Sequence, residues 1–170
     1  MKENLKMTFA KDLEALVIPW NKSPQCDSEK AQDYYWLPIL DLSEGRAKVG
    51  ITPEGVWGIA KDGCIRILSD ERSYVFLLPI LEKSPQAAFS LIAEGFINIG
   101  LSREYLDLFP FEGVILAALK SNSEYWSSMG LQWVGLFVRT PELQVSLEVL
   151  SREGATQEVR HRARKLARYR

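Results

Sequence analysis

The sequence predicts an α+β fold, in which a small antiparallel β meander packs on a stack of about three antiparallel helical hairpins within a single domain of 170 residues. Turn signals at residues 52–55 (TPEG) and 61–63 (KDG) separate three short apolar segments, as in a meander. Further along, helix start signals and apolar residues at helical spacing recur to the end of the chain. These observations divide the chain into a β-rich or mixed region, 1–83, and a helical region, 84–170.

The first region opens with a short helical pattern over residues 8–18, which Pro19 ends. The three expected strands follow between residues 48 and 68. A sheet this small is marginal alone, so we expect its apolar face to pack on another element. Residues 21–30 are polar and contain Pro24, which indicates a loop. The sequence otherwise leaves residues 20–45 unassigned, and the proline-containing apolar segment within 73–83 is either a further strand or a short buried helix.

The helical region contains repeated cap-and-proline starts, at Ser84-Pro85 and at Thr140-Pro141. Proline suits the first helical position, where its missing N–H would have had no partner. Short polar links predict three antiparallel hairpins, over residues 85–108, 110–137 and 141–169. The second is the most regular, and its tryptophans share one helix face.

Paired helices, short polar links and proline-started first helices resemble HEAT-like α-helical repeats over residues 85–169. Repeats of that family usually run longer than these units of roughly 25 to 30 residues, and a compact helical bundle leaves the same pattern. Both architectures stay open at this point. The resemblance implies recognition of another protein along one face of the stacked hairpins, and it identifies no partner.

The charge is unevenly distributed, although the formal net charge is only −1. The part before residue 160 has 15 basic and 22 acidic residues, whereas residues 160–170 contain six basic residues and no acid. Five of these six are candidate partner-binding residues: Arg160, Arg162, Arg164, Lys165 and Arg168. They predict self-pairing with the acidic body and the helix dipole, an acidic protein partner, or a nucleic acid bound by counterion release.

A second group of candidate partner-binding residues comprises Tyr125, Trp126 and Trp133. Seven residues separate the two tryptophans, so they lie on one helix face. Burial in the core is the first interpretation of this pattern. The alternative is that one of them is a partly exposed binding anchor, since tryptophan is enriched at interaction hot spots.

Catalytic and cofactor signatures are not found in the sequence. His161, the only histidine, lies among arginines and is interpreted as a helix-surface residue rather than a catalytic base or a zinc ligand. Cys26 and Cys64 have no C-x-x-C spacing. A disulfide between them stays open, and we expect free thiols in a reducing compartment. The glycines do not form a phosphate-binding loop. We predict no metal and no cofactor.

The sequence therefore predicts a non-enzymatic protein-binding chain of the adaptor, regulatory or immunity type, an analogy from fold alone. No segment reaches the 18 or more apolar residues of a membrane span, and no signal peptide is recognised, so we expect a cytoplasmic protein. The alternatives are a nucleic-acid-binding protein that uses the basic C-terminal helix and an enzyme with an unrecognised carboxylate site.

Overall fold

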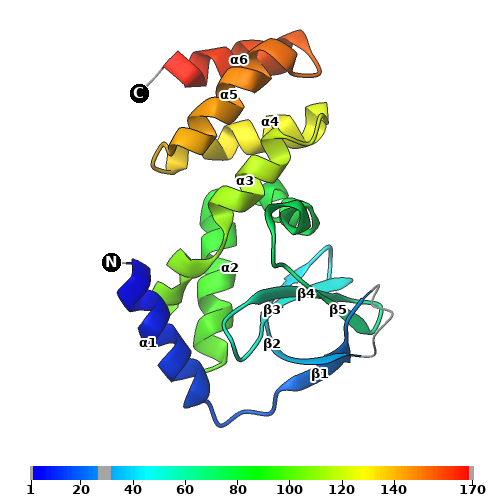
Figure 1. Ribbon diagram of the computed structural model, residues 1–170, viewed down its shortest axis with the longest axis vertical. Coiled ribbons are helices and arrows are strands. Elements are labelled where there is room, and N and C mark those ends of the chain that lie inside the picture. Colours follow the sequence, from blue (N-terminus) through cyan, green and yellow to red (C-terminus); the bar gives the residue numbers. More distant parts are fainter. Residues whose placement is uncertain (1, 27–31, 169–170) are drawn as a thin grey trace. The chain divides into compact units, whose positions relative to one another are not determined.

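A computed structural model describes residues 2–26 and 32–168, and it confirms the predicted α+β class (Figure 1). Contacts divide the chain into two compact units. The sheet unit comprises Met1–Ser73 and Gln86–Phe109, and the helical unit comprises Tyr74–Pro85 and Pro110–Arg170. The sequence groups residues 86–109 with the helical region. Their contacts place them in the sheet unit instead. The single domain that the sequence predicts stays a prediction.

The elements of the sheet unit begin with helix α1 (Lys2–Glu14), which starts earlier than the predicted pattern and ends before Pro19. Five strands follow: β1 (Asn21–Pro24), β2 (Asp33–Leu42), β3 (Ala47–Ile51), β4 (Trp57–Lys61) and β5 (Cys64–Ile67). The chain passes from one unit to the other within the 3-10 helix η1 (Glu71–Glu82). Most of residues 73–83, which the sequence leaves open, are therefore helical. Helix α2 (Pro85–Asn98) and the 3-10 helix η2 (Arg103–Leu108) complete the series.

The strands form one antiparallel sheet in the order β1-β2-β3-β4-β5. The predicted meander is β3-β4-β5. Its first turn has Gly55 at a φ of 76°, and its second has both Asp62 and Gly63 at positive φ, the conformation that makes Asp-Gly a hairpin signal. The loop predicted over residues 21–30 is wrong for Asn21–Pro24, which form β1, and residues 27–30 lie outside the described residues. The sequence did not assign β2. Pro38 obscured β2, and the structure accommodates this proline where the β2–β3 register shifts between Pro38 and Leu40.

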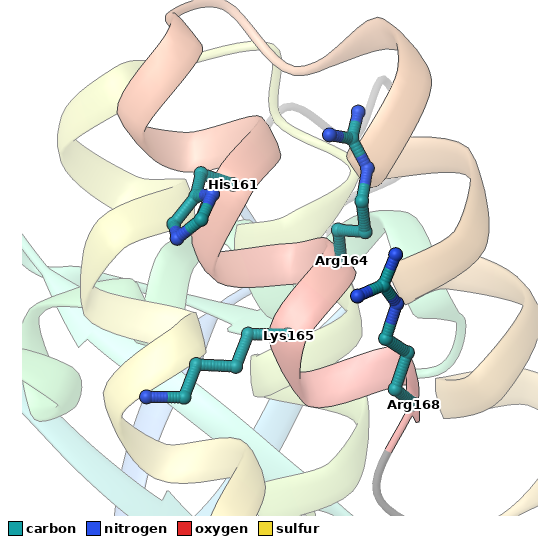
Figure 2. Close-up of a pocket in the computed structure, with 4 residues that line it drawn as sticks. All are labelled: His161, Arg164, Lys165 and Arg168. Carbon is teal, nitrogen blue, oxygen red and sulfur yellow. The ribbon is translucent and has the colours of Figure 1, made fainter.

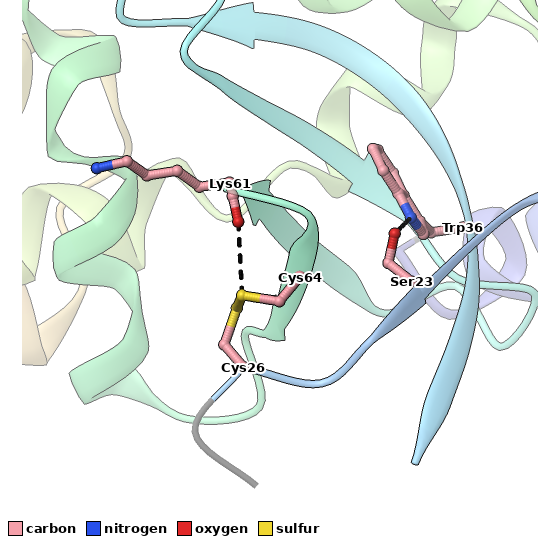
Figure 3. Close-up of a disulfide and its surroundings, with 5 residues drawn as sticks. All are labelled: Ser23, Cys26, Trp36, Lys61 and Cys64. Carbon is pink, nitrogen blue, oxygen red and sulfur yellow. Dashed lines mark hydrogen bonds between the residues drawn. A yellow bond between two sulfur atoms is a disulfide. The ribbon is translucent and has the colours of Figure 1, made fainter. Parts of the chain in front are cut away.

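The two edges of the sheet, β1 and β5, are joined at one point. Gln25 forms an isolated parallel bridge with Ile65, and the Cys26 amide donates to the Ile65 carbonyl at 2.8 Å. Cys26 and Cys64 form a disulfide, so the prediction of free thiols is wrong (Figure 3). The two cysteines are 38 positions apart in the sequence, and they come close only because the strands pair. Their spacing along the chain therefore did not indicate a disulfide.

An aromatic cluster forms the core between the sheet and the helices of the sheet unit. Phe96 of α2 has its ring centroid 5.9 Å from that of Phe9 and 5.8 Å from that of Trp57. The ring centroids of Tyr105 in η2 and Phe9 lie 4.7 Å apart. The Tyr105 hydroxyl donates a hydrogen bond to the Asp12 carboxylate of α1. Helix α2 approaches β2 so closely that a Cβ at residue 95 would lie 1.9 Å from the Ile39 carbonyl oxygen, which requires Gly95.

The elements of the helical unit include α3 (Phe111–Leu119), α4 (Glu124–Trp133), the 3-10 helix η3 (Val134–Leu136), α5 (Pro141–Glu153) and α6 (Gln157–Arg168). These helices correspond to the second and third predicted hairpins. The predicted apolar stripes of α3 and α5 are buried, whereas those of α4 and α6 are buried in part, since Trp126 and Leu166 are half-buried. No single helix within the described ranges is long and apolar enough to cross a membrane, although η1 and α2 together have the length and composition to do so as a bent pair.

Candidate partner-binding surface

Trp133 lies in the core of the helical unit, with 1% of its surface exposed. Its indole N–H donates to the Leu81 carbonyl of η1 at 3.2 Å, and its ring stacks on Phe111 at a centroid distance of 5.8 Å. A buried indole needs such a partner for its N–H. Trp133 is therefore a core residue, and a partner bound at the surface would not contact its side chain.

Tyr125 and Trp126 lie in the first turn of α4, after the cap in which Ser123 Oγ accepts from the Trp126 amide. Their rings meet edge to face at 4.9 Å. Tyr125 is 51% exposed, and its hydroxyl donates to Glu82 Oε1 at 2.7 Å. This hydrogen bond, then burial and the Glu82 charge, raise the pKa of Tyr125. Trp126 is half-buried. Of the three aromatic candidates, Tyr125 is thus the exposed one.

The α5–α6 hairpin carries the basic candidates, and both of its helices begin at threonine caps. Thr140 Oγ1 accepts from the Leu143 amide and donates to Glu112 of α3 at 2.5 Å, which fixes α5 to α3. Thr156 Oγ1 accepts from the Val159 amide at the start of α6. Each cap satisfies an N–H that has no partner within its helix.

Each helix of the hairpin also has its C-terminal end capped by side chains from outside that helix. Arg160 Nη1 donates to the Gly154 carbonyl at 2.7 Å, and Arg164 Nη2 donates to the Ser151 carbonyl at 3.2 Å, both at the end of α5. In return, Arg139 and Gln144 donate to the Leu166 and Ala167 carbonyls of α6. Cations are favourable at the negative end of a helix dipole. Arg160 and Arg164 are therefore structural as well as charged.

The outer side of α6 presents four exposed residues, His161, Arg164, Lys165 and Arg168, which we call the basic face. Figure 2 shows that His161 and Lys165 project to one side of the helix, whereas Arg164 and Arg168 project to the other, toward α5. Each pair has the i, i+4 spacing that places two side chains on one helix surface. The remaining candidates, Arg160 and Arg162, are half-buried beside this face.

The basic face borders an open hollow of about 470 Å³. The described residues that line it come from one helix, so no second wall encloses the hollow within the described part of the chain. The side chains diverge rather than converge on one point (Figure 2). This geometry suits an extended acidic segment that crosses the helix better than a small ligand, since ligand pockets are concave and bury most of their ligand.

The cations of α6 are not neutralised by the carboxylates that the structure describes. None of Arg160, Arg162, Arg164, Lys165 and Arg168 has a carboxylate within 4.0 Å in residues 2–26 and 32–168. By contrast, Lys120 pairs with Glu142 at 3.0 Å within the same unit. Self-pairing with the acidic body, one of the interpretations of the sequence, is therefore not found among the described residues.

Exposed apolar side chains lie on the same hairpin as the basic face and were missed by the sequence analysis. Val145 and Val149 of α5 are 57% and 40% exposed, on the side opposite its buried leucines. Their i, i+4 spacing was the available signal. No group of three or more His, Cys, Asp or Glu residues that would hold a metal ion occurs in the described part of the chain.

Comparisons of the chain with family models, curated proteins and solved structures found no match.

Proposed function

We propose that this chain is a binding protein that recognises an acidic segment of a partner protein through the basic face of α6. The supporting observation is that Arg164, Lys165 and Arg168 are exposed, project to two sides of α6 and have no carboxylate partner among the described residues. Long-range attraction between opposite charges accelerates encounter and orients the partner, while apolar and hydrogen-bonding contacts supply most of the lasting affinity.

The surroundings of the basic face favour a protein over a nucleic acid. Val145 and Val149 add exposed apolar surface on the same hairpin, and mixed apolar and arginine-rich surfaces are typical of protein interfaces. The helical unit as a whole carries ten Lys or Arg against seven Glu, a modest excess for a chain that must follow a phosphate backbone. The HEAT-like resemblance stays a prediction; on that architecture, α5–α6 is the hairpin that presents the binding surface.

The test compares two double charge reversals in the full chain. Lys165→Glu with Arg168→Glu changes the basic face but leaves the end-capping arginines in place. Lys61→Glu with Arg103→Glu changes the net charge by the same amount at exposed positions of the sheet unit. Fluorescence anisotropy of a labelled poly-glutamate peptide measures binding. We expect the first variant to lose about tenfold in affinity, roughly the effect of two exposed ion pairs, and the second to bind as the wild type does.

Two further outcomes decide against the proposal. Equal loss in the two variants would mean that the peptide responds to net charge and not to the basic face. Tighter binding of an oligonucleotide with the same number of charges, with a steeper salt dependence that the Lys165→Glu and Arg168→Glu changes remove, would favour the nucleic-acid alternative. Raising the salt concentration should weaken the peptide complex, because the exposed charges are screened.

The expected localisation depends in part on whether the two cysteines are oxidised. The cytoplasmic prediction used two arguments, the lack of a recognised signal peptide and the expectation of free thiols. The Cys26–Cys64 disulfide removes the second, because disulfides persist in oxidising compartments and are rare in the cytosol. We therefore propose that the protein spends part of its life in an oxidising compartment, where this disulfide forms.

A further inference from the structure

We propose that the Cys26–Cys64 disulfide is a reducible latch, which holds strand β1 against the β5 edge and whose reduction lets β1 open while the rest of the sheet unit stays folded. This inference concerns the sheet unit and is independent of the proposed function of α6.

The latch lies where the two edges of the sheet meet. Apart from the disulfide, the described residues link β1 to β5 through the Gln25–Ile65 bridge and the hydrogen bond from the Cys26 amide to the Ile65 carbonyl. Both links involve residues within one position of a cysteine. Figure 3 shows the disulfide just after the end of β1 and at the start of β5. Cutting this one covalent bond therefore acts directly on the whole junction.

Strand β1 has little else that would hold it in place. Its four residues, Asn21, Lys22, Ser23 and Pro24, are exposed or half-buried and contribute no buried apolar side chain to the core. Besides its backbone pairing with β2, it is tied by an exposed ion pair, Lys22 to Asp33 at 2.9 Å, and by the Trp36 indole, which donates to Ser23 Oγ at 3.0 Å. Segments with few buried apolar contacts are the first to open locally.

The remainder of the sheet unit has a core that does not pass through the latch. Val49 and Ile51 of β3 are fully buried, and the aromatic cluster of Phe9, Trp57 and Phe96 joins the helices to the sheet. Loss of the disulfide leaves these contacts in place. We therefore expect reduction to produce local opening of β1, with an unpaired outer edge on β5, rather than collapse of the unit.

The cysteines are suited to exchange with a dithiol. Both are half-buried, so a small thiolate has access to the sulfurs. A dithiol reductant attacks one sulfur, the S–S bond breaks and a mixed disulfide forms, and its second thiol then displaces the remaining cysteine. Two electrons and two protons pass to the protein, and the reductant leaves as its own disulfide.

The reduced state has an acceptor ready for one of the new thiols. Cys64 Sγ lies 3.4 Å from the Lys61 carbonyl oxygen (Figure 3). A sulfur in a disulfide carries no hydrogen, so this approach is a contact in the oxidised protein. After reduction, the Cys64 S–H is placed to donate to that carbonyl as a weak hydrogen bond. This weak hydrogen bond would hold the thiol at its own turn.

Hydrogen exchange followed by mass spectrometry tests the latch in the full chain. The protein is compared as purified, after treatment with dithiothreitol, and as the Cys26→Ser and Cys64→Ser double variant. We expect exchange at least about tenfold faster in peptides that cover residues 21–26 and 64–68 in the reduced protein and in the double variant. At the short labelling times on which β1 exchanges, peptides from β3, β4 and α2 should remain protected, because their amides open only when the whole unit unfolds.

A further variant, Ser23→Ala, reports on the coupling between the disulfide and the opening. It removes the partner of the Trp36 indole and should accelerate exchange at residues 21–26 only when the disulfide is absent. Equal exchange in the oxidised and reduced proteins would overturn the proposal, because the edges would then stay joined without the bond. Loss of protection in β3, β4 and α2 at the same short labelling times as in β1 would also overturn it, since the disulfide would then hold the whole unit together.

Discussion

Three buried tryptophans of this chain are each positioned by a hydrogen bond from the indole N–H. Trp57 donates to the Leu108 carbonyl, Trp133 to the Leu81 carbonyl and Trp36 to Ser23 Oγ, at 3.2, 3.2 and 3.0 Å. Within the described residues, no buried side-chain nitrogen or oxygen lacks a partner. Burial of a polar group without a partner costs about 1–3 kcal/mol, so each of these bonds fixes an orientation as well as a position.

Tyr105 gives a prediction with a defined pH window. Burial, followed by its hydrogen bond to Asp12 and the Asp12 charge, raises the pKa of Tyr105 to about 12. The folded protein thus holds the phenol proton more tightly than the unfolded chain, whose tyrosines have a pKa near 10. The resulting stability is complete below about pH 10 and is lost as the pH rises toward 12.

The Tyr105→Phe variant removes this contribution. We expect it to be less stable than the wild type at about pH 8, and the difference between the two free energies of unfolding to shrink from about pH 10 to about pH 12. Urea denaturation at several pH values measures both. A difference that stays constant over this range would show that the phenol proton is not linked to folding. Subtraction cancels the titration of other groups, since they are common to both proteins.

At the scale of elements, close packing of backbone decides which residues are tolerated where helix α2 crosses strand β2. Any Cβ at position 95 would lie 1.9 Å from the Ile39 carbonyl oxygen and 2.7 Å from the Ile39 carbonyl carbon. These are backbone atoms, which cannot rotate away as a side chain does. Helix α2 and strand β2 would have to separate.

Gly95→Ala is therefore expected to destabilise the sheet unit by about 1–3 kcal/mol or more, as overpacking does, although alanine is the better helix former. Gly135→Ala in η3 is the matched control, because a Cβ at that position would have no heavy atom within 4 Å beyond its chain neighbours. Chemical denaturation compares the two. A neutral Gly95→Ala would mean that the helix moves away without cost.

At the scale of the whole molecule, the disulfide changes the unfolded state as well as the folded one. It closes a loop between residues 38 positions apart. In the chain-entropy description, a loop of this size stabilises the folded protein by about 4 kcal/mol, because the unfolded chain loses conformations. That effect is separate from the local opening of β1, which concerns the folded state.

Replacing both cysteines by serine should therefore lower the free energy of unfolding by up to about 4 kcal/mol. Guanidinium denaturation of the oxidised protein, the reduced protein and the double variant measures the loss, and the last two should agree. If the three proteins unfold at the same denaturant concentration, the disulfide contributes nothing to stability under those conditions.

The sequence by itself determined the features that depend on local chemistry. The turns at 52–55 and 61–63, the threonine cap of α5 and the apolar stripes of α3 to α6 follow from residues close in the chain, and so does the α+β class. The concentration of cations near the C-terminus is likewise a property of composition. These features needed no knowledge of distant contacts.

Tertiary structure alone decided how distant residues are used. It paired Cys26 with Cys64, placed residues 86–109 with the sheet, and made β1 and β2 part of that sheet despite Pro38. It also separated the cations of α6 into end caps, Arg160 and Arg164, and exposed charges such as Lys165. The physical reason is the same throughout: the partner of each group is distant in sequence, so spacing along one segment carries no information about it.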